Sequence, residues 1–485
     1  MRKVHTFDIF DSLVARRCIN PISVFYEVER DSKVENFTQI RRKAEEKVSH
    51  SSHNLDSIYE EIVRSFGISY EMADNLKKLE ISYEIKNAIP IQENIDQVHD
   101  GDVLVTDMYL PRQVIEAILE KVGLRKQVGL IISNKGKHSG DIWPKLKNTL
   151  LIEQHLGDNI HSDVNNALSN GIFGIHVENH KLTHFEQFFE NNGFSLLSKA
   201  IRETRLRSIT GNLINQQNEQ RMLQINYNLP ILIMACAHIH LTSELNNVKK
   251  VLFSSRDCYI LEKVYRVFAE SNNWPEESCY FFTSRVSRLK SSSPYIAYFK
   301  SLMKDKSMVV DLCGSGWSLG QLYFKSECNP LSYFLQFYNS SAVKSNYEEI
   351  RSFKLDHQPF FLTDDETIAN ANIELINYIY SGMFLDMKFL EGYEGYIPEF
   401  ENPNYPPSVL NTLQQMQIAQ DLFLDTLKNY DLVMMMSEIN LNISKLPNMI
   451  VQLLNFMAQN MGCMTDVLQD HVSQGKKSMM RLRNT

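Results

Sequence analysis

Hydrophobic and polar residues follow two different periods in the first part of the chain. Residues 4–10 form a short apolar run with β-branched and aromatic side chains, which predicts a buried strand. The pattern then becomes polar, with apolar positions about 3.6 residues apart, and it predicts helices at residues 37–46, 58–63 and 70–86. Because the next strand begins only at residue 103, we expect a helical insertion after the first strand.

Beyond the insertion, short apolar runs alternate with amphipathic segments. Strands are predicted at residues 103–106, 130–133, 154–157 and 174–177, with helices at 112–121, 143–150 and 164–169 between them. This alternation is typical of a Rossmann-like parallel sheet covered by helices. A second α/β pattern begins near residue 249, and the chain reads as mainly helical from about residue 368. We expect three parts: residues 1–185 with the insertion at about 14–98, residues 200–367, and residues 368–485.

Composition narrows the class of protein. The chain has 485 residues, of which 43% are hydrophobic and 22% charged, and its net charge of -8 gives no basic surface for nucleic acid, which is not an expected partner. The seven cysteines are scattered without a C-x-x-C pair, so we expect reduced thiols and a cytoplasmic protein. No apolar run reaches about 18 residues, so no membrane span is expected, and the longest one, residues 229–237, should be a buried helix.

Two aspartates, Asp8 and Asp11, follow the first predicted strand three positions apart. A tight loop there would present both carboxylates at one end of the sheet. Such a pair suits covalent catalysis, with Asp8 as nucleophile and Asp11 as proton donor and acceptor.

Three later segments carry groups suited to phosphate chemistry at the carboxyl ends of strands, where open parallel sheets bind ligands. Thr106 ends the second strand with a hydroxyl that can donate to a phosphate oxygen, and a lysine after the third strand could neutralise the phosphate. Asp158 follows a strand and a glycine, and Asp163 lies about one helical turn further on. Carboxylates alone would repel a phosphate, so we expect a divalent cation, and hard oxygen ligands favour Mg²⁺.

The four segments read FDIFDSLVARR, VTDMYLPRQVI, KHSGDIW and HLGDNIHSDVNNALSNGI. Over about residues 3–180 the chain resembles the phosphohydrolases of the haloacid dehalogenase superfamily. It is especially similar to a bacterial subgroup of hydrolases associated with surface-polysaccharide synthesis.

The resemblance implies a role for each residue. Asp8 would form an aspartyl-phosphate, while Asp11 would protonate the leaving oxygen and then activate water. The carbonyl of Phe10 would join Asp8 and Asp158 on Mg²⁺, with Asp163 supporting this metal shell. Thr106 and a lysine would hold the phosphate; the spacing to Gly140 and Trp143 favours Lys137, with Lys135 as the alternative. The helical insertion would be the family's cap, and Ser12 stands where threonine is commoner but keeps the hydroxyl.

Two smaller expectations concern single side chains. Arg41 and Glu45, four residues apart on a predicted helix, should form an ion pair at the surface. His155 belongs to no recognisable set of metal ligands, so we expect a structural or substrate-facing role.

The second α/β region offers a further candidate site. Arg256 and Asp257 follow one predicted strand, Arg285 follows the next, and Asp311 and Ser315 lie at the third. Arginine at such positions is a natural anion ligand. The stretch around Asp311 is similar to a phosphoribosyltransferase loop but lacks its second acid. It is therefore either a phosphate- or sugar-nucleotide-binding loop or a tight turn of a structural domain.

Together these patterns predict a Mg²⁺-dependent phosphatase that acts on a small phosphorylated metabolite, such as a sugar phosphate or a nucleotide. The alternative is a bifunctional protein. Its second half would then be a phosphoribosyltransferase-like or glycan-biosynthesis transferase or binding module, with the first domain in a supporting or regulatory role. The Met-rich helices after about residue 410 should serve internal packing or a homo-oligomer interface.

Overall fold

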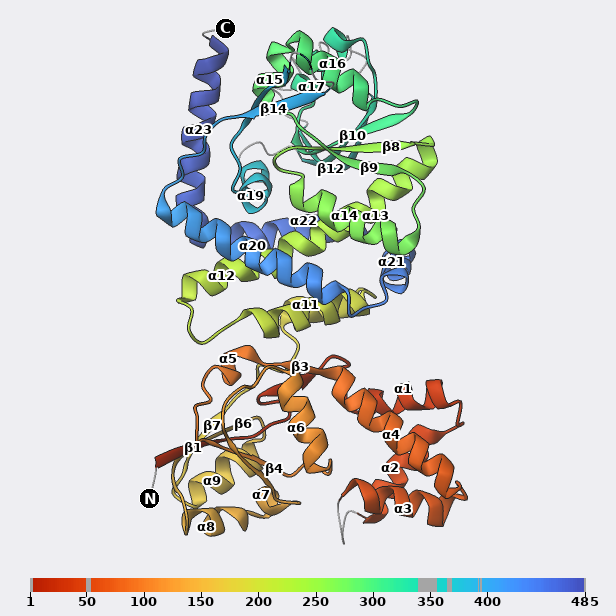
Figure 1. Cartoon of the computed structure of the whole chain (residues 1–485), viewed down its shortest axis with the longest axis vertical. Helices are drawn as coiled ribbons and strands as arrows, with labels where there is room; N and C mark the ends of the chain where they lie inside the picture. The colour runs from red at the N-terminus through yellow and green to blue at the C-terminus, as the bar shows by residue number, and fades with distance from the viewer. Residues whose placement is uncertain are drawn as a thin grey trace. The chain divides into compact units, whose positions relative to one another are not determined.

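The computed structural model describes residues 3–48, 54–338, 356–363, 369–390, 392 and 395–483 (Figure 1). It divides into two compact units, one of residues 1–184 with 202–213 and one of residues 185–201 with 214–485. Each unit contains a five-stranded sheet whose neighbouring strands are parallel. The expected α/β class is therefore confirmed, while the division into three parts stays a prediction.

The sheet of the first unit has the strand order β5-β4-β1-β6-β7. Its strands are β1 (Lys3–Phe7), β4 (Val103–Thr106), β5 (Gly129–Ile132), β6 (Leu151–Gly157) and β7 (Phe173–His176). The helices that connect them are α6 (Arg112–Lys121), α7 (Gly136–Ser139), α8 (Ile142–Lys147), a π-helix (Ile160–Asn165) and α9 (Asn166–Ser169). The chain builds outward from β1 in both directions, so the strand order reverses between β1 and β6, and parallel sheets bind ligands at such a reversal.

A helical segment is inserted between β1 and β4. It comprises α1 (Ile22–Ser32), α2 (Phe37–Val48), α3 (Leu55–Phe66), α4 (Tyr70–Asn87) and the short α5 (Gln92–Ile95). The strands β2 (Val14–Arg16) and β3 (Ala88–Pro90) pair antiparallel, so the chain leaves and re-enters through one two-stranded stem. Apolar side chains of these helices share one buried cluster with those of β1 and β4. Burial of this apolar surface fixes the insertion to the sheet.

The sheet of the second unit has the order β12-β11-β10-β8-β9. The strands are β8 (Lys250–Ser254), β9 (Glu277–Phe281), β10 (Ser307–Gly314), β11 (Leu331–Tyr338) and β12 (His357–Thr363). Helices α14 (Tyr259–Asn272), α15 (Arg285–Lys290), α16 (Ser293–Leu302) and α17 (Trp317–Ser326) connect the first four strands. Here the strand order reverses between β8 and β10.

Helices α10 (His184–Asn191), α11 (Ser195–Ser208), α12 (Asn215–Leu223), a π-helix (Gln224–Asn228) and α13 (Leu229–Asn246) precede this sheet. By length and composition residues 215–246 could cross a membrane, but 89% of their most apolar window is buried within the protein. Every residue of the expected buried helix, 229–237, is buried inside α13. That expectation is confirmed.

After residue 368 the chain forms α19 (Ala369–Ile376), α20 (Pro407–Leu427), α21 (Leu432–Leu441), α22 (Leu446–Gln459) and α23 (Thr465–Arg483). Between α19 and α20, however, β13 (Phe384–Phe389) and β14 (Tyr396–Phe400) form an antiparallel hairpin. The region is thus mainly helical, as expected, and this hairpin interrupts it, with Phe384 and Met387 buried in an aromatic cluster of the second sheet. Met435 and Met436 are buried in the core, as expected for packing, and a homo-oligomer interface stays a prediction.

Candidate active site

Two carboxylates flank the point where the strand order of the first sheet reverses. Asp8 directly follows β1, and its backbone N–H donates to the carbonyl of Leu156 in β6 at 2.8 Å. Asp158 directly follows β6. Both aspartates therefore lie at the carboxyl ends of neighbouring strands, beside the reversal where parallel sheets bind ligands.

Lys137 provides a positive charge beside these carboxylates. Its Nζ contacts Asp8 Oδ1 and lies 2.7 Å from Asp163 Oδ1, and its side chain is only 5% exposed. Lys135 is exposed, in the turn that leads into α7. The structure therefore brings Lys137, rather than Lys135, against the carboxylate of Asp8.

The charged side chains of Asp8, Lys137 and Asp163 shift one another's pKa. Burial raises the pKa of Asp8 to about 7, although the ammonium of Lys137 opposes this shift. Burial works against the charge of Lys137, yet the carboxylates of Asp8 and Asp163 hold its pKa above the ordinary value. Burial also opposes ionisation of Asp163, but the hydrogen bond from His155 and the charge of Lys137 bring its pKa below the usual range. Asp163 and Lys137 are therefore charged at neutral pH.

Asp163 uses both of its oxygens to hold its neighbours. Oδ1 accepts from Lys137 and lies 3.2 Å from His155 Nε2, while Oδ2 accepts the backbone N–H of Asn159 at 3.0 Å. These contacts make Asp163 the residue that orients Lys137. Its expected support of a metal shell stays a prediction.

His155 and Gly157 complete this support; the sequence predicts a structural or substrate-facing role for His155 and no role of its own for Gly157. His155 is fully buried; its Nδ1 lies 2.9 Å from Thr6 Oγ1, and its ring packs edge-on against Trp143. Burial lowers the pKa of His155, so the ring is neutral. A Cβ at Gly157 would lie 2.3 Å from Asp163 Cγ, so only glycine leaves room for that carboxylate. The glycine between a strand and Asp158 was the only sequence signal.

The carboxylates also provide a place for a cation. Oxygens of Asp8, Asp158 and Asp163 lie within 4.8 Å of one another, and ligand atoms of Asp11, Asp158 and His180 form a second such group. Burial, and next the carboxylate of Asp11, raise the pKa of Asp158, so a cation would relieve the crowding of negative charge. Hard carboxylate oxygens fit Mg²⁺.

The loop after β1 contains three further candidate residues of this site, Phe10, Asp11 and Ser12. Ser12 Oγ lies 3.1 Å from Asp8 Oδ2 and 3.4 Å from Asp158 Oδ1, so its hydroxyl sits between them. Asp11 adopts a left-handed backbone conformation, with φ of 60°. Phe10 lies in the same turn, and metal binding by its carbonyl stays a prediction.

Thr106 ends β4 and Asp107 follows it, close to the turn that contains Lys137. The Asp107 carboxylate accepts the backbone N–H groups of Lys137 at 3.2 Å and of His138 at 3.0 Å, and also the hydroxyl of Ser133. Asp107 thereby anchors the turn that carries the lysine. Thr106 is buried at the end of β4, where its Oγ1 accepts the N–H of Met108 at 3.2 Å. Its expected contact with phosphate stays a prediction.

Two buried ion pairs hold the insertion together, one between its stem and α4 and one between α2 and α4. Arg16 Nε donates to Glu84 of α4 at 2.9 Å, and its guanidinium lies 4.8 Å from the ring centre of Phe10. Arg41 donates twice to Glu80, at 2.7 and 2.9 Å, and is fully buried. The expectation of a surface pair was therefore wrong: Arg41 does contact Glu45, but the fold turns both partners of its main ion pair away from solvent.

The candidate residues of the second unit are only partly brought together. Arg256 and Asp257 follow β8, and burial, together with the charge of Glu374, raises the pKa of Asp257 to about 6. Asp311 lies in β10 and accepts from Arg288 at 2.8 Å, a partner that the sequence did not single out. Two further candidates lie in other places: Arg285 is exposed at the start of α15, and Ser315 is half-buried ahead of α17.

Comparison with known proteins adds no further assignment. Models of known protein families were scanned and none matches the chain, and a search of curated proteins finds no match either. The geometry and the sequence motifs therefore carry the functional argument.

Proposed function

We propose that the first unit is a Mg²⁺-dependent phosphohydrolase that works through an aspartyl-phosphate on Asp8. One observation carries this proposal. Asp8, Lys137 and Asp158, from three separate loops, converge where the strand order of the first sheet reverses, and Lys137 contacts the carboxylate of Asp8 directly. A nucleophile, a buried cation and a second carboxylate are the groups that phosphoryl transfer requires.

The residues divide the chemistry in two steps. In the first, a carboxylate oxygen of Asp8 attacks phosphorus, the bond from phosphorus to the ester oxygen breaks, and Asp11 gives its proton to that oxygen. In the second, Asp11 takes a proton from water, the water oxygen attacks phosphorus, and the bond between Asp8 and phosphorus breaks. Inorganic phosphate leaves with Asp8 and Asp11 restored.

The supporting residues hold this arrangement. Lys137 would neutralise the charge shared by Asp8 and the phosphoryl oxygens, and Asp163 holds its ammonium in place. Asp8, Asp158 and the Phe10 carbonyl would hold Mg²⁺, which supplies positive charge against the substrate's phosphate. Because the carboxylates of Asp8 and Asp163 hold the pKa of this ammonium above its ordinary value, it is protonated when the substrate binds.

We further propose that the helical insertion acts as a cap and that the substrate is a small phosphorylated metabolite. The antiparallel stem and the Arg16–Glu84 pair place the insertion next to the loop that contains Phe10. A body of helices there would exclude large substrates. This organisation resembles the haloacid dehalogenase phosphohydrolases, in line with the motif similarity.

The test is phosphate release from a panel of sugar phosphates and nucleotides, with Mg²⁺ and with EDTA. The wild-type chain should hydrolyse at least one of them with Mg²⁺ only. The Asp8→Asn variant should lose this activity while it keeps the wild-type melting temperature, and the matched control Lys135→Met should keep the activity. Turnover by the Asp8→Asn variant at the wild-type rate would remove Asp8 from the mechanism.

A further inference from the structure

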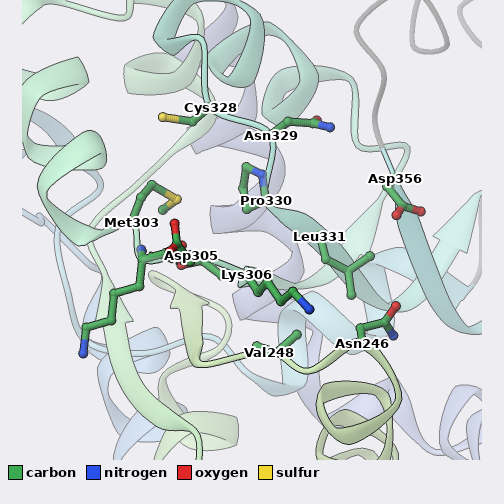
Figure 2. A pocket seen from close by; sticks show the side chains of 12 residues that line it. Asn246, Val248, Met303, Asp305, Lys306, Cys328, Asn329, Pro330, Leu331 and Asp356 are labelled. Carbon is green, nitrogen blue, oxygen red and sulfur yellow. Dashed lines mark hydrogen bonds between the residues drawn. The ribbon is translucent and has the colours of Figure 1, made fainter.

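Described residues of the second unit line cavities that include one at each end of its parallel strands. One, of about 420 Å³, lies at the amino ends of the strands and is lined by residues that precede β8, β10 and β11, such as Val248, Asp305 and Asn329 (Figure 2). The other, of about 440 Å³, is lined by Ser255 and Arg256 directly after β8 and by Tyr280 and Phe282 at the end of β9. Only this second cavity lies at the carboxyl ends of the strands.

The position of the second cavity matches a general rule of α/β sheets. The strand order reverses between β8 and β10, and ligands bind outside the carboxyl ends of the strands beside such a reversal. The loop of Ser255 and Arg256 begins at this point. The cavity volume also falls within the range of small-molecule sites, which is roughly 300–1,000 Å³.

Two cations, Arg256 and Lys263, line this cavity together with the carboxylate of Asp421. The charges of Asp257 and Glu374 also act on Arg256. The guanidinium of Arg256 lies 4.5 Å from the ring centre of Tyr378, and Lys263 Nζ lies 4.4 Å from that of Tyr259. Among the described residues neither side chain makes a salt bridge, and Arg256 Nη1 is buried without a hydrogen-bond partner. A buried polar group without a partner is costly, so the unpaired Nη1 of Arg256 favours an anion near this wall.

The remaining wall is mainly aromatic. Tyr280 packs edge-on against both Tyr259 and Phe282, and Phe282 in turn contacts Phe384 and Phe400 of the β13–β14 hairpin. Rings from several separate elements thus face one cavity. A heteroaromatic base can stack either of its flat faces on such aromatic rings. A sugar has only one apolar face, and that face is smaller.

We propose that this cavity binds a nucleotide, with its phosphate at Arg256 and Lys263 and its base against the aromatic wall of Tyr280 and Phe282. The site is independent of the phosphohydrolase proposed for the first unit. It does not include Asp311, whose carboxylate is held by Arg288.

The test is calorimetric titration of the full-length chain with ADP, UDP, glucose 1-phosphate and inorganic phosphate. EDTA is present throughout, because the site proposed in the first unit needs Mg²⁺. We expect a nucleotide to bind more tightly than either of the other two probes. Arg256→Met and Lys263→Met should each weaken nucleotide binding at least about tenfold, because each removes a charge-assisted contact.

Lys304 offers a matched control, since it lines the other cavity, that of Figure 2. Lys304→Met should bind nucleotide as the wild type does. Lys263 is half-buried on the surface of α14, so its variant tests the proposal even if Arg256→Met does not fold. Absence of nucleotide binding, equal binding of glucose 1-phosphate, or an unchanged affinity of the Lys263→Met chain would overturn the proposal.

Discussion

Replacing Lys137 by methionine tests the physical account of the first site most fully. The ammonium is almost completely buried and is held by the carboxylates of Asp8 and Asp163. Methionine fills similar volume but leaves two buried carboxylates without their shared cation. Removing one partner of a buried ion pair costs about 3–5 kcal/mol. We expect the first unit to lose stability by about that amount at pH 8.

The loss of stability caused by Lys137→Met should increase with pH. Burial already raises the pKa of Asp8 to about 7, and Lys137 holds it down, so without the lysine it rises further. A carboxyl group whose pKa is higher in the folded than in the unfolded chain takes up a proton on folding, so its penalty grows with pH. The difference in stability between the variant and the wild type should therefore be largest at pH 8 and shrink as the pH falls towards 5.

The assay is native-state hydrogen exchange of the peptides that contain β1 and β6, since it reports the first unit separately from the second. A loss of about 3 kcal/mol corresponds to exchange at least about a hundredfold faster in the variant at pH 8. The control is Lys135→Met, which changes an exposed lysine of the same loop and should stay within about 0.5 kcal/mol of the wild type. Equal protection of the Lys137→Met and wild-type chains at pH 8 would refute the reasoning.

Two further substitutions probe the support of the site and the insertion. Gly157→Ala should place a Cβ within 2.3 Å of Asp163 Cγ and displace that carboxylate, so phosphate release should fall at least about tenfold; wild-type activity would contradict the role given to Asp163. Glu80→Gln removes the charge that faces the buried Arg41, and hydrogen exchange in α2 and α4 should report a loss of about 3 kcal/mol. Its control is Glu116→Gln, which changes an exposed pair and should cost less than about 0.5 kcal/mol; equal effects would show that burial is not what matters.

Much of the α/β organisation could be predicted from hydrophobic periodicity, because most strands are short apolar runs and most helices are amphipathic. The helix expected at residues 112–121 has these bounds in the structure. The gathering of Asp8, Thr106 and Asp158 at one sheet edge follows from the parallel alternation alone. The hairpin near Phe384 was missed because its strands, of 6 and 5 residues, show no regular alternation of buried and exposed positions.

The ion-pair partners of individual side chains could not be predicted from the sequence, because they depend on turn conformation and on tertiary packing. Lys135 and Lys137 are two residues apart, and the conformation of the turn before α7 decides which of them contacts Asp8. Arg41 has Glu45 one helical turn away in sequence, yet its buried partner is Glu80, 39 residues further along the chain. In the second unit Asp311 accepts from Arg288, a residue that the sequence did not single out.

The central claim, that Asp8 accepts a phosphoryl group beside Mg²⁺, can be tested before any substrate is known. Beryllofluoride imitates a phosphoryl group on a carboxylate, and its fluorine resonances shift when it binds. We predict bound ¹⁹F signals for the wild-type and Lys135→Met chains with Mg²⁺, and none with EDTA or for Asp8→Asn. Bound signals that persist unchanged in the Asp8→Asn chain, or their absence from the wild type with Mg²⁺, would contradict the account.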